Sequence, residues 1–90
     1  MCRNIKPLFN FYPSATDNEV HEASLQYVRK ISGFHHPSKI NEEAFNHAIA
    51  HIEVASRELI ESLETNAPKR DRVEEAKKAH ERAVKRFGKN

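Results

Sequence analysis

The single cysteine of the chain, Cys2, directly follows Met1. Removal of Met1 would leave a thiol and a free α-amine on one residue, and a thiol with a neighbouring base can act as a nucleophile or chelate a metal. Arg3 lies next to it, and positive neighbours favour the reactive thiolate. We therefore take Cys2, Arg3 and Asn4 as candidate catalytic residues, with a buried or incidental thiol as the alternative.

Two of the six histidines have a spacing that suits a metal ion. His47 and His51 are four residues apart, so on a helix both imidazoles lie on one face and can share a metal. The alternative is a solvated or hydrogen-bonded pair on a polar face. The sequence requires no cofactor, so His47 and His51 remain candidate metal ligands.

The net charge of +2 is unevenly distributed along the chain. Residues 1–66 carry six Lys or Arg against nine acids, a net −3, whereas residues 67–90 carry nine bases and four acids, a net +5. This asymmetry suits an acidic partner such as nucleic acid, or self-association of an acidic body with a basic tail. A solvated helical face is the plain alternative. The candidate binding residues of the basic segment are Lys69, Arg70, Arg72, Lys78, Arg82 and Arg86.

Length and composition indicate one small domain, residues 1–90. The chain is 38% hydrophobic and 31% charged and contains two Gly and no Trp, a composition that suits helices. One Cys cannot form an internal disulfide, and no apolar run is long enough for a signal peptide or a membrane span. We expect a reduced, cytoplasmic protein without a membrane partner.

The N-terminal segment 2–13 is predicted to be an extended arm because Pro7 and Pro13 prevent a continuous helix. Its five large apolar residues are costly to expose, so we expect it to pack along a groove of the helical body. The first helix is predicted at about 17–31. Thr16 and Glu19 form a capping-box pattern before it, and Ser32 and Gly33 end it. Its apolar stripe is Val20, Ala23, Tyr27 and Ile31, and Leu25 and Val28 widen this face.

Two more helices complete a predicted all-α fold. The second spans about 41–64 with Ser38 or Asn41 as its cap, and its apolar residues repeat at steps of three and four. The third spans about 70–87, and its stripe of Val73, Ala76, His80, Ala83 and Phe87 is thin. Such a face buries little by itself, so a second chain is expected to complete it. This reasoning predicts a homodimer that associates through the second and third helices.

The order of elements resembles the histone fold of archaeal histones. A shorter helix, the turn 39–44, a long central helix, a basic turn and a third helix follow one another over about residues 17–87. The resemblance implies a dimer and nucleic-acid binding through the basic third helix.

Several longer motifs resemble a family of short bacterial proteins known as a domain of unknown function. The likeness spans residues 1 to about 72, and it implies a bacterial source, a stand-alone domain and a role for the start Cys2-Arg3-Asn4. The sequence favours a non-enzymatic interaction module, with a Cys2-dependent site and histone-like nucleic-acid binding as alternatives. The motifs are Met1-Cys2-Arg3-Asn4-Ile5, Leu8-Phe9-Asn10-Phe11, Leu25-Gln26-Tyr27-Val28-Arg29-Lys30, Ser32-Gly33-Phe34, Pro37-Ser38 and Asn41-Glu42-Glu43-Ala44-Phe45-Asn46.

Overall fold

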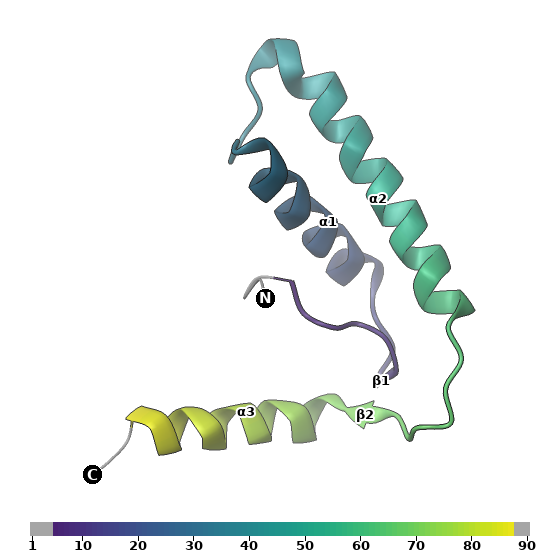
Figure 1. The fold of residues 1–90 in the computed structure, drawn as a ribbon, viewed down its shortest axis with the longest axis vertical. Helices are drawn as coiled ribbons and strands as arrows, with labels where there is room; N and C mark the ends of the chain where they lie inside the picture. The colour runs from purple at the N-terminus through teal and green to yellow at the C-terminus, as the bar shows by residue number, and fades with distance from the viewer. Residues whose placement is uncertain (1–4, 88–90) are drawn as a thin grey trace.

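The computed structural model describes residues 5–87 and shows three helices with a very small sheet (Figure 1). The first two helices form an antiparallel hairpin, and the third lies across the lower end of that hairpin. The prediction of an all-α fold with three helices is therefore confirmed. The elements are β1 (Phe11–Tyr12), α1 (Asp17–Ser32), the 3-10 turn η1 (Lys39–Asn41), α2 (Glu42–Ser62), β2 (Arg70–Asp71) and α3 (Arg72–Phe87).

The ends of α1 follow from local sequence signals. Thr16 accepts a hydrogen bond from the Glu19 N–H at 3.1 Å, and the Glu19 carboxylate accepts one from the Thr16 N–H at 2.9 Å. This is the predicted capping box, which satisfies backbone donors at the helix start. At the other end Gly33 has φ 79° and its N–H donates to the Arg29 carbonyl at 2.8 Å. Glycine adopts this left-handed conformation without steric cost, so α1 ends where predicted.

The start of α2 differs in detail from the prediction. Asn41 occupies the N-cap position, but its side chain makes no capping hydrogen bond and instead donates to the Ser38 hydroxyl at 2.8 Å. The turn η1 directly precedes the helix. At its end α2 stops at Ser62, because Leu63 adopts an extended conformation with ψ 142°.

The core lies between α1 and α2. A cluster of Val28, Phe45 and Ile49 is buried, and Val20 and Ser24 are 2% and 1% exposed. Ser24 tolerates this burial because its hydroxyl donates to the Val20 carbonyl at 2.8 Å. The buried row of α1 is therefore Val20, Ser24 and Val28.

The predicted apolar stripe of α1 was wrong in two of its members. Tyr27 is 48% exposed and Ile31 is 71% exposed, although both belong to the apolar side of the helix. Tyr27 lies beside the buried row of Val20, Ser24 and Val28. Ile31 continues that row into the last turn of α1, where it lines an open groove between α1 and α2.

The arm packs against the segment that precedes α3. β1 pairs with β2 in parallel, with Phe11 opposite Arg70 and Tyr12 opposite Asp71. Asn10, which has φ 67°, accepts a hydrogen bond from the Arg70 N–H at 2.8 Å. Its side-chain amide donates to the Pro68 carbonyl at 3.1 Å. Strands of two residues leave no periodic pattern, so sequence reasoning did not predict them.

The described chain is extended for its length. Its radius of gyration is 16.3 Å, whereas a compact domain of 90 residues has a value of about 12 Å. The principal extents are 50, 37 and 18 Å, and α3 points away from the hairpin (Figure 1). A large share of the helical surface is consequently exposed to water.

Candidate functional site

Arg72, the first residue of α3, joins three parts of the chain. Its Nη1 and Nη2 donate to the two carboxylate oxygens of Glu19 in α1, at 2.6 and 2.9 Å. Its Nε donates to the backbone carbonyl of Pro13 in the arm at 2.5 Å. A guanidinium group can make such forked contacts because its donors lie in one plane. Arg72 thus holds the arm, α1 and α3 together.

Phe11 of the arm lies against two guanidinium groups. The guanidinium carbons of Arg70 and Arg72 are 4.7 and 5.5 Å from the centre of the Phe11 ring, which is within the range of cation–π attraction. Arg70 also donates to the Glu75 carboxylate at 2.8 Å. We call the contacts of Phe11, Glu19, Arg70, Arg72 and Glu75 the Arg72 junction. The basic segment contains no aromatic residue next to these arginines, so only the folded chain reveals Phe11.

Both carboxyl groups of the Arg72 junction have lowered pKa values. The side-chain hydrogen bond from Arg72 is the main cause of the low pKa of Glu19, and the Thr16 N–H adds to it. The hydrogen bond from Arg70 lowers the pKa of Glu75, and the same contact raises the pKa of Arg70. These groups stay ionised at neutral pH. The junction therefore consists of two ion pairs, and neither carboxyl group is tuned to exchange a proton near neutrality.

Acid is expected to weaken the Arg72 junction. The folded-state pKa of Glu19 lies below its ordinary value of 4.5, so its contribution to stability is present above that pH and is lost as the pH falls through the folded-state pKa. Glu19→Gln removes this titration and should flatten the decrease of the urea midpoint below about pH 5. Circular dichroism during urea unfolding measures this, with the exposed Glu22→Gln of the same helix as the control. An equally steep decrease in Glu19→Gln and the wild type would contradict the assignment.

A groove of about 470 Å³ runs between the arm and α3, next to the Arg72 junction. Its walls include Lys6 and Leu8 from the arm and Ala76, Ala79 and Arg82 from α3. Alanine leaves little side chain to fill the space between the two segments. The groove thus marks where α3 packs incompletely on the arm.

The predicted basic binding residues divide into two groups. Arg70 and Arg72 are engaged within the chain by Glu75 and Glu19. Lys69, Lys78, Arg82 and Arg86 are exposed, as Arg70 also is, and contact of the basic residues with an acidic partner stays a prediction.

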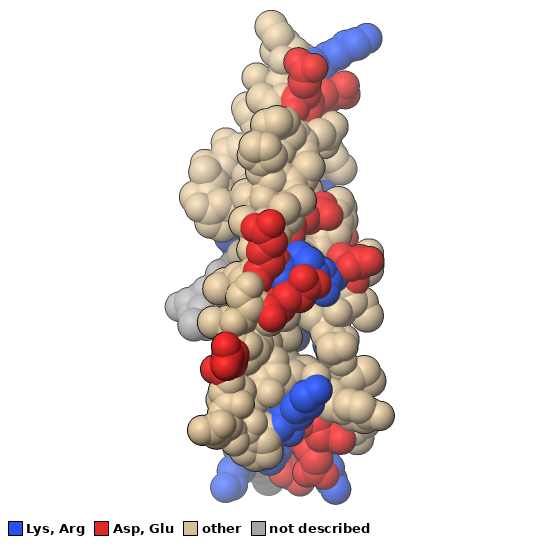
Figure 2. Space-filling model, turned by 90° about the vertical axis from the view of Figure 1, so that its right-hand side faces the viewer, with Lys and Arg blue, Asp and Glu red and all other residues tan. Residues whose placement is uncertain are grey.

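The charge asymmetry separates two parts of the fold. The helical hairpin, residues 17–62, carries eight acids and four bases, whereas α3 carries three acids and six bases. Figure 2 looks onto the right-hand side of the view in Figure 1 and shows acidic side chains spread over the height of the molecule. By these counts the hairpin is net acidic and α3 is net basic.

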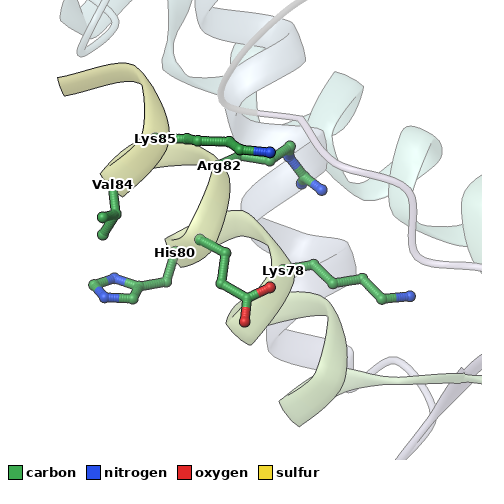
Figure 3. A pocket seen from close by; sticks show the side chains of 6 residues that line it. Lys78, His80, Arg82, Val84 and Lys85 are labelled. Carbon is green, nitrogen blue, oxygen red and sulfur yellow. The ribbon is translucent and has the colours of Figure 1, made fainter. Parts of the chain in front are cut away.

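A hollow of about 680 Å³ lies on α3 alone. Figure 3 shows that His80 and Val84 point to one side of the helix while Lys78 and Arg82 point to the other. Every residue that lines this hollow comes from one helix, so no second element closes over it. It is an open helix surface and carries no argument for a ligand site.

The two candidate metal ligands do lie together. The rings of His47 and His51 have their centres 4.2 Å apart on α2. Within residues 5–87 there is no group of three His, Cys, Asp or Glu side chains that could hold a metal ion. The candidates Cys2, Arg3 and Asn4 lie outside the described residues, so their catalytic role stays a prediction.

An apolar groove of about 310 Å³ opens between the end of α1 and the start of α2. Tyr27, Ile31 and Phe34 form one wall, and Ala44 and Ala48 form the other. We call this the hairpin groove. All three residues of the first wall are at least 43% exposed. Large apolar side chains around a groove lined by small ones are typical of a surface that receives another apolar side chain.

The same apolar surface continues along α2. Leu59 and Leu63 are 57% and 44% exposed, although the sequence pattern predicted them as part of the apolar side. The cause is the position of α3, which lies across the hairpin end instead of along α2 (Figure 1). The sequence pattern identified these residues as part of the apolar side of the helix, and the structure shows that α3 does not cover them.

Among residues 5–87 no helix is long and apolar enough to cross a membrane.

Comparisons with known proteins give a family and no activity. No curated protein matches the chain, and no solved structure matches it. The sequence model of a family described as "Uncharacterized conserved protein (DUF2277)" matches residues 1–85. The match covers most of the chain, which therefore belongs to this family of uncharacterized conserved proteins.

Proposed function

We propose that the protein is a non-enzymatic interaction module that self-associates through α2 and α3. The observation that carries this proposal is its extended shape, with a radius of gyration of 16.3 Å against about 12 Å for a compact chain of this length. An extended small chain leaves apolar side chains in water. A second chain that covers them gains the free energy of their burial.

The side chains available for this contact are large and exposed. They are Leu59 on α2 and Leu63 directly after it, and on α3 they are Val73 and Val84, which are 76% and 53% exposed. Complete burial of one such side chain is worth about 1.5 to 3 kcal/mol. Several of them together can offset the loss of translational and rotational freedom on association.

The polar contacts support a structural role rather than a catalytic one. Arg72 with Glu19 and Arg70 with Glu75 join segments of the same chain. The low pKa values of the two carboxyl groups suit permanent ion pairs, whereas general acid–base catalysis requires a pKa near the working pH. The described polar clusters therefore favour a binding module.

We also propose a bacterial, cytoplasmic setting. The single cysteine cannot form an intramolecular disulfide, and disulfides are what small extracellular domains commonly use to gain stability. The sequence motifs resemble those of short bacterial proteins.

Leu59→Glu is expected to abolish self-association. The substitution places a charge in the apolar surface of α2, and burying that charge without a partner in a dimer costs several kcal/mol. Sedimentation equilibrium over a range of protein concentrations should show a dimer for the wild type and a monomer for Leu59→Glu.

Val54→Glu is the matched control for this test. Val54 lies on the same helix and is 58% exposed, close to the 57% of Leu59, but it lies on a different side of α2. We expect Val54→Glu to sediment like the wild type. A wild type that is monomeric at the highest concentration would overturn the proposed function, and equal effects of the two substitutions would exclude the α2 surface.

A further inference from the structure

We propose that α2 pairs with α2 of a second copy in an antiparallel, two-fold arrangement that places Leu59 and Leu63 of each copy at the hairpin groove of the other. This inference rests on the proposed self-association and specifies its geometry.

One side of α2 carries an uninterrupted series of apolar residues. Helical residues three and four positions apart lie on one face, so these residues form a single row beside the buried pair Phe45 and Ile49. No charged residue belongs to the row. We call it the α2 apolar row, and its members are Ala44, Ala48, Ile52, Ala55 and Leu59 of α2 together with Leu63, the residue that directly follows the helix.

The residues of the α2 apolar row are ordered by size. Its N-terminal end holds two alanines and its C-terminal end holds two leucines. A two-fold axis at the midpoint between residues 53 and 54 brings Ala48 opposite Leu59 and Ala44 opposite Leu63, because each pair is equally distant from that midpoint. The same axis brings Ile52 opposite Ala55, so every facing pair combines one large and one small side chain.

Such pairing is what close packing across a helix interface requires. Large residues fill the space that small residues leave, without voids and without overlap. Parallel pairing would place leucine on leucine at one end and alanine on alanine at the other. The first contact is overpacked and the second leaves a cavity. The size order along α2 therefore favours a second copy in the antiparallel direction over any parallel pairing.

The hairpin groove lies where this arrangement needs space. It opens at Ala44 and Ala48, and its opposite wall is formed by Tyr27, Ile31 and Phe34. The leucines of the second copy arrive at these two alanines, so the wall residues can contact them from the α1 side. The edge of the row carries His51 and Glu58, which the same axis brings to neighbouring positions where they can form a hydrogen bond between copies.

A size-swap experiment tests this register. Ala48→Leu should overpack against Leu59 of the other copy, and Leu59→Ala should leave a cavity at Ala48. Each single substitution occurs twice in a dimer, so we expect the dissociation constant to rise at least about tenfold for either variant. The double variant A48L/L59A restores one large and one small side chain at each contact. Its dissociation constant should return to within about threefold of the wild-type value.

The outcome separates this inference from the proposed function. A wild type that dimerises while A48L/L59A is weaker than both single variants would overturn the antiparallel register and leave self-association standing. A monomeric wild type would overturn both. Circular dichroism of each variant checks the hairpin itself, because Ala48 also packs against the core cluster.

Spin labels give an independent readout of direction. Glu43, Val54 and Glu61 are exposed and lie on one side of α2, away from the α2 apolar row. Labelled one at a time as cysteines in a Cys2→Ser background, they should give a short distance between copies at Val54. The axial separation between copies should grow to about 22 Å at Glu61 and about 31 Å at Glu43, since each residue rises 1.5 Å. Three equal distances would mean a parallel dimer and would overturn the inference.

Discussion

Phe45→Ala is expected to remove a large part of the stability of the folded protein. Phe45 is 7% exposed at the centre of the cluster that joins α1 to α2, where it packs with Val28 and Ile49. Removing a buried phenyl ring costs about 3 to 5 kcal/mol, because the burial is lost and a cavity remains. A domain of 90 residues has a total stability of about 5 to 13 kcal/mol. Thermal unfolding followed by circular dichroism should show a midpoint lowered by about 15 °C or more.

The size of this effect follows from how little core the chain has. Among the described residues the buried apolar side chains are Val20, Val28, Phe45 and Ile49, so one ring is a large part of the total. Val54→Ala removes an exposed apolar side chain from the same helix and should change the free energy of unfolding by less than about 0.5 kcal/mol. Both variants are compared with the wild type at one protein concentration, because association stabilises the folded state. Similar midpoints for Phe45→Ala and Val54→Ala would show that the α1 and α2 contact is not the core.

Arg72→Ala is expected to release the arm and α3 from α1 while the hairpin stays folded. The substitution removes both hydrogen bonds to Glu19 and the one to Pro13, and it leaves the Glu19 carboxylate without its guanidinium partner. Charged hydrogen bonds at a site about one third exposed are worth about 1 to 2 kcal/mol in total after allowance for solvent. Hydrogen exchange should show lower protection of β2 and the first turn of α3, with α1 and α2 little changed.

Arg70→Ala is the matched control for Arg72→Ala. Both arginines lie against Phe11, but Arg70 pairs with Glu75 in its own segment and does not reach α1. We expect Arg70→Ala to lower protection less than Arg72→Ala does. Arg72→Lys should recover only part of the protection, because an ammonium group keeps the charge but cannot form the planar fork with a carboxylate. Equal protection in Arg72→Ala and the wild type would show that the β1 and β2 pairing alone holds α3.

The experiments on Phe45 and Arg72 probe two parts of the fold that differ in how they arise from the sequence. Phe45 lies in a long helix whose apolar periodicity is evident in the sequence, and its burial follows from that pattern. Arg72 acts through Glu19 and Pro13, both far away in the sequence. Sequence reasoning placed Arg72 among residues for an external acidic partner, and the folded chain uses it internally.

Only one of the two roles of Glu19 could be predicted from the sequence. Its role in the capping box was predicted, because the Thr16 hydroxyl and the Glu19 carboxylate are three residues apart and their contact is local. The same carboxylate also accepts both hydrogen bonds from Arg72. No spacing rule relates these two positions, since their separation depends on the path of the whole chain between them.

The sequence by itself determined the three helices, the two ends of α1 and the unequal charge of the hairpin and α3. Capping by Thr16, termination at Gly33 and the apolar periodicity of α2 depend on residues within one or two turns of each other. A short stretch of sequence is therefore enough to predict them. Only the tertiary structure decided that α1 buries Ser24 instead of Tyr27, that Phe11 meets two arginines, and that α3 leaves Leu59 exposed. Each of these outcomes depends on how helices cross and where the arm passes. Such arrangements are set by the sum of many weak contacts between distant residues, and no local pattern records that sum.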